Sequence, residues 1–260
     1  MIGLIDTDIV AYRCSASAEK ESEKDIAIWR CDDLMHSILH NTGSTEYEAY
    51  LSGQTNYRKR IDPEYKANRI QPRPKWLELC REHLVTKWSA RVCDDIEADD
   101  GIGIAQSYYF DAGIPSVVCS IDKDFFQLPG KHYQWEISGT TAKGTTWVKE
   151  EQHIFVTPLD GIRTFYRHLL IGDTSDNIVG VDRIGKTKAH KYIDHLTEEM
   201  DMYEVVQSLY KDDERLEKNC QLVWILRKEN TRWSSPITRK QEMETQQLSS
   251  DLPVNLLDPG

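Results

Sequence analysis

Residues 91–124, RVCDDIEADDGIGIAQSYYFDAGIPSVVCSIDKD, contain the pattern that decides the fold. A short apolar segment at 91–93 precedes a helical pattern at 97–110, and a β-branched run follows at 116–121. A strand, a helix and a second strand in this order predict two parallel strands joined by a crossover helix. Both strands are followed directly by acidic residues.

The same alternation continues towards the N-terminus. An apolar run at 2–5 predicts a buried strand, 24–40 a helix and 47–51 a strand, and Pro72 and Pro74 open a helix that continues to Trp88. Alternating strands and helices predict an α/β fold with a mostly parallel sheet flanked by helices.

The pattern changes in the second half of the chain. Residues 133–137 and 145–148 predict a hairpin, and 159–171, 186–196, 202–210 and 216–228 predict helices. The polar stretch from Trp233 predicts a loose tail. We therefore expect an α/β domain at 1–157, a helical subdomain at 158–232 and a polar tail at 233–260.

The composition is that of a soluble globular protein, with 260 residues, 39% hydrophobic and 29% charged. No apolar run approaches the ~20 residues of a membrane span, and Asp6 and Asp8 interrupt the N-terminal apolar stretch as no signal peptide would. Six cysteines without a C-x-x-C motif fit reduced thiols, so we expect a cytoplasmic protein without a membrane partner.

The net charge of −11 hides a local reversal. Residues 57–91 hold ten Lys or Arg and four acidic residues, which leaves a strongly acidic remainder. Such asymmetry is typical of a surface that meets a polyanion, although a solvated helix face would look the same.

Acidic residues follow three predicted strands and one predicted helix. They are Asp6 and Asp8, the group at 94–100, Asp122 and Asp124, and Asp173 and Asp176. Each alone is more often a helix cap, but parallel strands bring their carboxyl ends to one edge, where so many carboxylates would repel one another. Divalent cations relieve that repulsion, and oxygen ligands without His or Cys suit Mg²⁺ or Mn²⁺. Two ions about 3.5–4 Å apart can clamp the attacking and leaving oxygens of a phosphodiester.

Two further segments carry phosphate-binding features. YRKRIDPEYKANR at 57–69 combines cations with an aromatic ring that could stack on an unpaired base. GDTSDNIVGVDRIGKTKA at 172–189 places Gly180 and Gly185 around a turn before a helix, whose N-terminal amides can hold a phosphate.

Taken together, these motifs resemble the 5′-nuclease superfamily of flap endonucleases, bacteriophage 5′→3′ exonucleases and the 5′-nuclease domain of bacterial DNA polymerase I. The resemblance covers residues 1–196. It rests on Asp6, Y-K-A-N-R at 65–69, E-A-D-D at 97–100, S-x-D-x-D at 120–124 and G-D-x-x-D-N at 172–177.

The resemblance implies a PIN-like α/β fold whose helical subdomain contains a helix–hairpin–helix-like DNA-binding motif. It implies exonucleolytic or flap-endonucleolytic hydrolysis of DNA, leaving 5′-phosphate products, in replication or recombination. The cofactors would be two Mg²⁺ ions, with Mn²⁺ as a substitute, and a K⁺ ion at the hairpin. The partner would be DNA with a 5′ end, flap or nick, or an RNA–DNA hybrid, bound by a monomer.

The resemblance also assigns residues. The catalytic set is Lys66, Asp6, Asp122 and Asp124. The metal ligands are Asp6, Glu97, Asp99, Asp100, Asp122, Asp124, Asp173 and Asp176. The DNA contacts are Arg13, Arg58, Lys59, Tyr65, Lys66, Arg69, Arg183, Lys186 and Lys188.

The sequence departs from the family pattern in places. Ser52 stands where an acid is usual, Arg183 stands where glycine is usual, and 187–188 read T-K instead of K-T. The segment between Arg69 and Trp76 is short, so we expect no large helical arch over the site.

Three other readings remain open. Asp6, Asp8 and Val10 fit the D-x-D-x-[TV] loop of a haloacid-dehalogenase-type phosphatase, in which Asp6 would be the nucleophile. A PIN-type ribonuclease would share the acidic cleft without the hairpin. A DNA-junction binder without activity would not need the intact acids.

Overall fold

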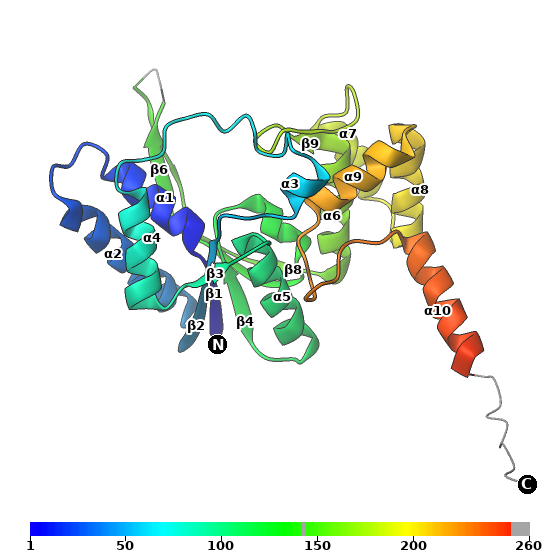
Figure 1. Cartoon of the computed structure of the whole chain (residues 1–260), viewed down its shortest axis with the longest axis horizontal. Coiled ribbons are helices and arrows are strands. Elements are labelled where there is room, and N and C mark those ends of the chain that lie inside the picture. The colour runs from blue at the N-terminus through cyan, green and yellow to red at the C-terminus, as the bar shows by residue number, and fades with distance from the viewer. Residues whose placement is uncertain (142–143, 251–260) are drawn as a thin grey trace, which may run out of the picture.

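The computed structural model describes residues 1–141 and 144–250 and contains a central six-stranded sheet (Figure 1). The strand order is β3-β2-β1-β4-β5-β8. The strands are β1 (Ile2–Asp6), β2 (Glu46–Ser52), β3 (Arg91–Cys93), β4 (Ser116–Cys119), β5 (Gly130–Gln134) and β8 (Gln152–Val156). The first five run parallel, and β8 pairs antiparallel with β5. The predicted mostly parallel α/β fold is confirmed.

Helices cover both faces of the sheet. Neighbouring residues of β1 and β4 point to opposite faces, with Ile5 and Val117 in one core and Leu4 and Val118 in another. The first core lies under α1 (Thr7–Ser17), α2 (Lys24–Thr42) and α4 (Leu77–Trp88), and the second under α5 (Ala98–Asp111). Strands buried on both faces explain the continuous apolar runs in the sequence.

The C-terminal part is helical, as predicted. Its core lies among α6 (Pro158–Ile171), α7 (Lys186–Ile193), α8 (Glu199–Tyr210) and α9 (Asp213–Val223). Two short strands, β9 (Gly172–Asp173) and β10 (Ile178–Val179), form a hairpin after α6. The chain then returns to the α/β part, where Ile225 packs in the core that contains α5.

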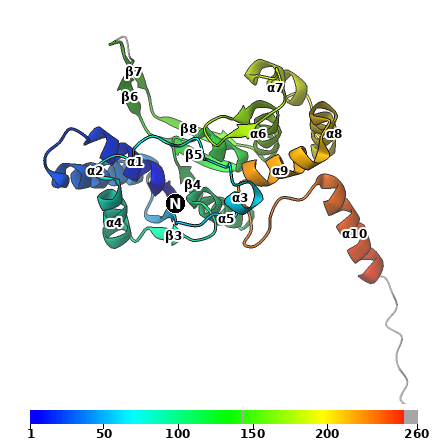
Figure 2. The same ribbon diagram turned by 45° about the horizontal axis from the view of Figure 1, so that its top comes forward.

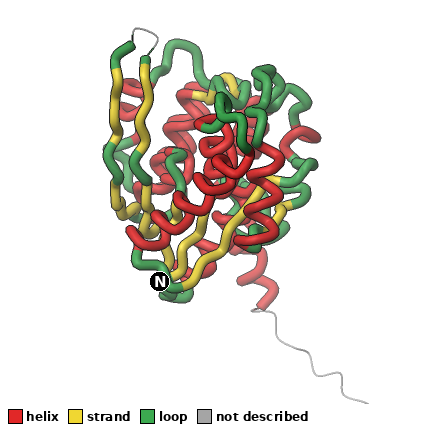
Figure 3. Tube along the Cα trace, turned by 90° about the vertical axis from the view of Figure 1, so that its left-hand side faces the viewer, coloured by secondary structure: helices red, strands yellow, loops and turns green. Residues whose placement is uncertain are grey.

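Several predicted elements differ from the structure. Residues 133–137 do not form one arm of a hairpin, because β5 ends at Gln134 within the main sheet. The hairpin is instead β6 (Ile137–Thr140) with β7 (Thr146–Lys149), and it extends away from the sheet (Figures 2 and 3). In the helix that was expected to open at Pro72 and Pro74, both prolines lie before the first turn, since α4 begins at Leu77.

The predicted loose tail is also wrong for most of its length. Trp233 is 4% exposed and packs in the helical core, and α10 (Pro236–Ser250) follows it. Residues 251–260 of the predicted tail lie outside the described residues. No helix in the described ranges is long and apolar enough to span a membrane.

Candidate metal and nucleic-acid site

Three acidic side chains meet at the carboxyl edge of the sheet. Asp6 ends β1, Asp122 follows β4, and Asp99 lies in the first turn of α5. The Ser120 hydroxyl donates to Asp6 Oδ2 at 2.8 Å and accepts from the Asp122 amide at 3.1 Å. The neighbouring strands β1 and β4 therefore fix two of these acids relative to each other.

Each of these carboxylates makes the ionised form of its neighbours less stable. Burial, and then the charge of Asp8, raise the pKa of Asp6 to about 7. Burial and the nearby charges of Asp6, Glu97 and Asp122 raise the pKa of Asp99 well above its usual range. A cation bound at this edge would compensate the charge of Asp6 and Asp99 and so favour their ionised forms.

Glu97 has the opposite environment. Burial opposes its ionisation, but the charges of Lys66 and Arg58 outweigh that effect and lower its pKa. The Lys66 ammonium donates to Glu97 Oε1, and the Tyr65 hydroxyl donates to Glu97 Oε2 at 2.9 Å. Lys66 thus reaches the acidic site, and its role beside a scissile phosphate stays a prediction.

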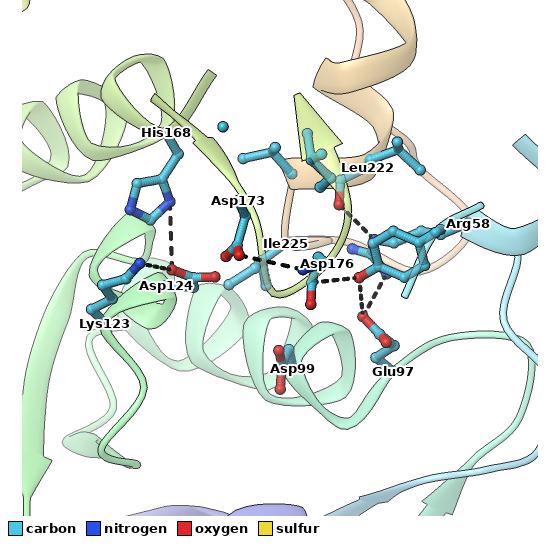
Figure 4. Close-up of a pocket in the computed structure, with 14 residues that line it drawn as sticks. Arg58, Glu97, Asp99, Lys123, Asp124, His168, Asp173, Asp176, Leu222 and Ile225 are labelled. Atoms are coloured by element: carbon cyan, nitrogen blue, oxygen red, sulfur yellow. Dashed lines mark hydrogen bonds and ion pairs between the residues drawn. The ribbon is translucent and has the colours of Figure 1, made fainter. Parts of the chain in front are cut away.

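A second acidic group lines the same pocket as Glu97 and Asp99 (Figure 4). It contains Asp124, from the 3₁₀ helix η1 (Lys123–Gln127), and Asp173 and Asp176, which end and follow β9. Burial and the charge of Asp122 raise the pKa of Asp124 to about 7. Its Oδ1 atom is buried without a hydrogen-bond partner among the described residues, so it is suited to accept a cation.

The Y-K-A-N-R and G-D-x-x-D-N motifs bind each other. The Lys66 amide donates to the Asp176 carbonyl at 3.0 Å, and Asn177 Nδ2 donates to the Glu64 carbonyl at 2.9 Å. Arg69 also pairs with the Asp176 carboxylate. Lys66 has a φ of 58°, a left-handed conformation that is rare for a lysine and that these contacts hold in place.

Three predicted roles are wrong. Tyr65 is 3% exposed and donates to Glu97 and Asp176, so its ring offers no face to a base. Arg58 is 2% exposed and grips Asp100 with two hydrogen bonds of 2.6 and 2.8 Å, so it does not contact DNA. Asp100 is fully buried and also accepts from the Leu226 amide at 3.0 Å, so it is not a metal ligand.

The other predicted DNA contacts remain near the surface. Lys59, Lys186 and Lys188 are exposed, Arg13 on α1 is partly buried, and the Arg69 side chain is 56% exposed. Arg183 is also exposed and takes a left-handed φ of 57° where glycine was expected. Residues 62–76 contain no helix, in agreement with the predicted absence of a large arch.

The Gly180–Gly185 turn has a feature that bears on the expected K⁺ ion. The Lys188 ammonium donates to the Arg183 carbonyl at 2.9 Å. A K⁺ ion bound by that carbonyl would have to displace the ammonium. The side-chain ammonium of Lys188 therefore already places a positive charge at this carbonyl.

The phosphatase reading fits the structure poorly. Asp6 is 2% exposed, and both its carboxylate oxygens accept hydrogen bonds within the protein. Asp8, the expected acid/base, pairs with Arg81 and accepts from the Ser52 amide at 2.8 Å. Because Asp8 is held by Arg81 and the Ser52 amide, it is poorly placed to act as the acid/base of that mechanism.

One residue at the site was not found from the sequence. His168, in the last turn of α6, lies with its Nδ1 3.7 Å from Asp124 Oδ1. Burial lowers its pKa to about 4, so the ring is neutral at pH 7. In the sequence, His168 lies one helical turn before the G-D-x-x-D-N motif, and this spacing could have identified it as a residue of the site.

The acidic side chains lie near one another without forming a preassembled set of metal ligands among the described residues. In the part of the chain that the structure describes, no three Asp, Glu, His or Cys side chains are already arranged to hold a metal. Metal binding therefore requires rotamer changes among carboxylates that already lie at the same edge.

Comparisons with known proteins agree with this geometry. Residues 1–154 match the family of the 5′-3′ exonuclease, N-terminal resolvase-like domain. The chain is 32% identical over 208 residues to DNA polymerase I of Bacillus caldotenax, and over 202 residues to that of Geobacillus stearothermophilus. Each match covers 73% of this chain and 23% of the polymerase, so the chain spans less than a quarter of these relatives.

Solved structures share the fold. The 5′-exonuclease of bacteriophage T5 with divalent zinc ions aligns with a TM-score of 0.62 and 17% identity, covering 85% of this chain and 88% of that one. The T5 flap endonuclease in a pseudo-enzyme-product complex with DNA and metal ions aligns with a TM-score of 0.61 and 15% identity, covering 86% and 88%. Because the family model matches more than half of its residues, the chain belongs to the 5′-nuclease superfamily.

Proposed function

We propose that this protein is a divalent-metal-dependent 5′-nuclease that hydrolyses DNA as a 5′→3′ exonuclease and flap endonuclease in replication or recombination. The observation that carries the proposal is the meeting of Asp6, Asp99 and Asp122 at one sheet edge, where burial and mutual repulsion raise the pKa of Asp6 and Asp99. Family membership supplies the reaction class, since T5 relatives are named as exonuclease and flap endonuclease.

The donor set fits two hard cations. Asp6, Asp99, Asp122 and Glu97 would hold one Mg²⁺ ion, and Asp124, Asp173 and Asp176 a second, with Mn²⁺ as a substitute. Such ions lower the pKa of bound water and stabilise charge on a phosphodiester. A K⁺ ion is not part of the proposal, because the Lys188 ammonium already donates a hydrogen bond to the Arg183 carbonyl.

The chain's own residues would bind and orient the DNA. Arg183, Lys186 and Lys188 lie around the turn before α7 and would hold duplex phosphates. Lys59, Arg69 and Arg13 would contact the strand that enters the pocket. Lys66, already at Glu97, would donate to a phosphoryl oxygen in the transition state.

A substrate panel tests this proposal. Purified protein is incubated with 5′-flap, 3′-flap, nicked and single-stranded DNA and with an RNA–DNA hybrid, in Mg²⁺ or in EDTA. We expect cleavage of substrates with a 5′ end, 5′-phosphate products, and no cleavage in EDTA. Cleavage in EDTA, or of the 3′ flap alone, would contradict the proposal. The hybrid decides whether RNA is also a substrate, and light scattering tests the predicted monomer.

A further inference from the structure

His168 lies beside the second acidic group, but the ligand set proposed above gives it no role. It comes from α6 and lines the same pocket as Asp124 and Asp173 (Figure 4). Its side chain is 18% exposed, and its Nδ1 faces Asp124 Oδ1. An imidazole is therefore built into the edge of a group that is otherwise made of carboxylates.

The position of His168 is fixed by helix packing. Residues seven apart lie on the same face of a helix, and Gly161 is seven residues before His168. A Cβ at Gly161 would lie 2.6 Å from the Gln127 carbonyl, so only glycine lets α6 approach η1 this closely. That close contact brings His168 beside Asp124, which η1 carries.

The contact between His168 and Asp124 is not a hydrogen bond. At 3.7 Å, it exceeds the ~2.7–3.2 Å of a protein N–H···O bond. The Lys123 ammonium is also 3.7 Å from Asp124 Oδ1, and its side chain is 69% exposed. A buried carboxylate oxygen thus has nitrogen atoms on two sides, and the described residues give it no hydrogen bond.

This spacing suits a shared metal ion. Two neighbouring donor atoms that each lie about 2.0–2.2 Å from one ion are about 2.8–3.6 Å apart in octahedral or tetrahedral geometry. The 3.7 Å between His168 Nδ1 and Asp124 Oδ1 is just above that range, so a small side-chain rotation brings both atoms within reach of one ion. The exposed Lys123 side chain can swing away when a cation arrives.

We infer that His168 is a nitrogen ligand of the ion held by Asp124 and Asp173, an assignment that rests on the function proposed above. Imidazole favours transition-metal ions, whereas carboxylates alone suit Mg²⁺. The second site therefore prefers a transition metal, while the first site, made of oxygen donors, accepts Mg²⁺.

Nitrogen coordination has a spectroscopic signature that does not depend on activity. Mn²⁺ is added to the full chain, its binding is measured by electron paramagnetic resonance, and electron spin-echo envelope modulation detects ¹⁴N coupled to the bound ion. The variants are His168→Gln, which removes the imidazole, and His168→Asp, which restores an oxygen donor. His195→Gln is the matched control, because His195 is exposed on the same subdomain.

The inference predicts a ¹⁴N coupling in the wild type and in His195→Gln that disappears in both His168 variants. It also predicts Mn²⁺ affinity at the second site at least roughly tenfold lower in His168→Gln, and a Mn²⁺-over-Mg²⁺ preference reduced in His168→Asp. If the His168→Gln variant proves too unstable to fold, His168→Asp alone decides the coupling.

Two other results are distinguishable. Bound Mn²⁺ without ¹⁴N coupling, or with a coupling that survives in a folded His168 variant, would overturn the assignment of His168 and leave the proposed nuclease intact. Failure to bind any Mn²⁺ would overturn both the ligand and the metal-dependent function.

Discussion

Lys66 contacts the G-D-x-x-D-N motif through its backbone and the E-A-D-D motif through its side chain, at the proposed active site. Its amide binds the Asp176 carbonyl, and its ammonium reaches Glu97. Lys66→Ala should lower kcat by roughly ten- to a thousandfold, the cost of removing one transition-state donor. Single-turnover cleavage gives the rate, and DNA affinity measured separately should change little. A loss that appears only in affinity would assign Lys66 to substrate binding instead.

Asp99 provides a test of the acidic site that needs no substrate. Its pKa is raised in the folded protein, so the folded state keeps a proton that the unfolded state releases, and stability falls as pH rises above the ordinary value. In EDTA at pH 8, Asp99→Asn should therefore melt about 2–6 °C higher than the wild type.

Mg²⁺ should reverse that order by stabilising the wild type more than Asp99→Asn. Asp94→Asn is the matched control, since Asp94 is an exposed acid in the loop just before α5. An Asp99→Asn variant that is less stable than the wild type in EDTA would show that the carboxylates do not repel one another as described.

At the scale of elements, Asp32 joins α2 to α4. It accepts hydrogen bonds from Trp88 and His83 at 2.7 Å and from Lys87 at 2.8 Å. Burial opposes its ionisation, but these bonds outweigh it and lower its pKa to about 2. Its contribution to stability is therefore complete above its ordinary pKa of 3.8 and is lost as pH falls towards 2.

Asp32→Asn should lower the free energy of unfolding by about 1–3 kcal/mol at pH 7, and the difference should shrink at pH 3. Urea unfolding at the two pH values measures it. Asp33→Asn, at the exposed neighbouring position, should have little effect. An equal loss at both pH values would mean that Asp32 stabilises the helices without its charge.

The turn before α7 gives a second prediction at this scale. Because Lys188 already donates to the Arg183 carbonyl, DNA affinity should be the same in KCl and NaCl at equal ionic strength. Fluorescence anisotropy with duplex DNA in Ca²⁺, which is expected to support binding without turnover, measures this. Several-fold tighter binding in KCl would show that K⁺ displaces the ammonium.

Elements with a strong local pattern could be predicted, and the others could not. The strand β3 and the helix α5 could be predicted from the sequence, because acidic residues separate them and apolar residues recur within them. The helix α1 was missed, since the face that it buries mixes Val10, Ala11 and Cys14 with the polar Thr7 and Ser15, which weakens its apolar periodicity. The roles of Arg58 and Asp100 depend on contacts with residues 222–226, more than a hundred positions away, which no local pattern reveals.

At the scale of the whole molecule, the pocket lies where the α/β part and the helical part meet. Glu97 and Asp99 come from the first, and Asp173 and Asp176 from the second, so both parts supply carboxylates (Figure 4). The sequence predicted that carboxylates from both parts lie together, because the acidic residues follow the ends of three predicted strands and of one predicted helix. It did not reveal His168, which carries no motif of its own.

The central claim is that carboxylates from separate strands act together as a metal-dependent nuclease. It is tested most directly by single-turnover cleavage of a labelled 5′-flap DNA in Mg²⁺ by the wild type and Asp122→Asn, with DNA affinity measured in parallel. We predict that the wild type cleaves and that Asp122→Asn binds the DNA without cleaving it. Cleavage by Asp122→Asn at the wild-type rate would contradict the account.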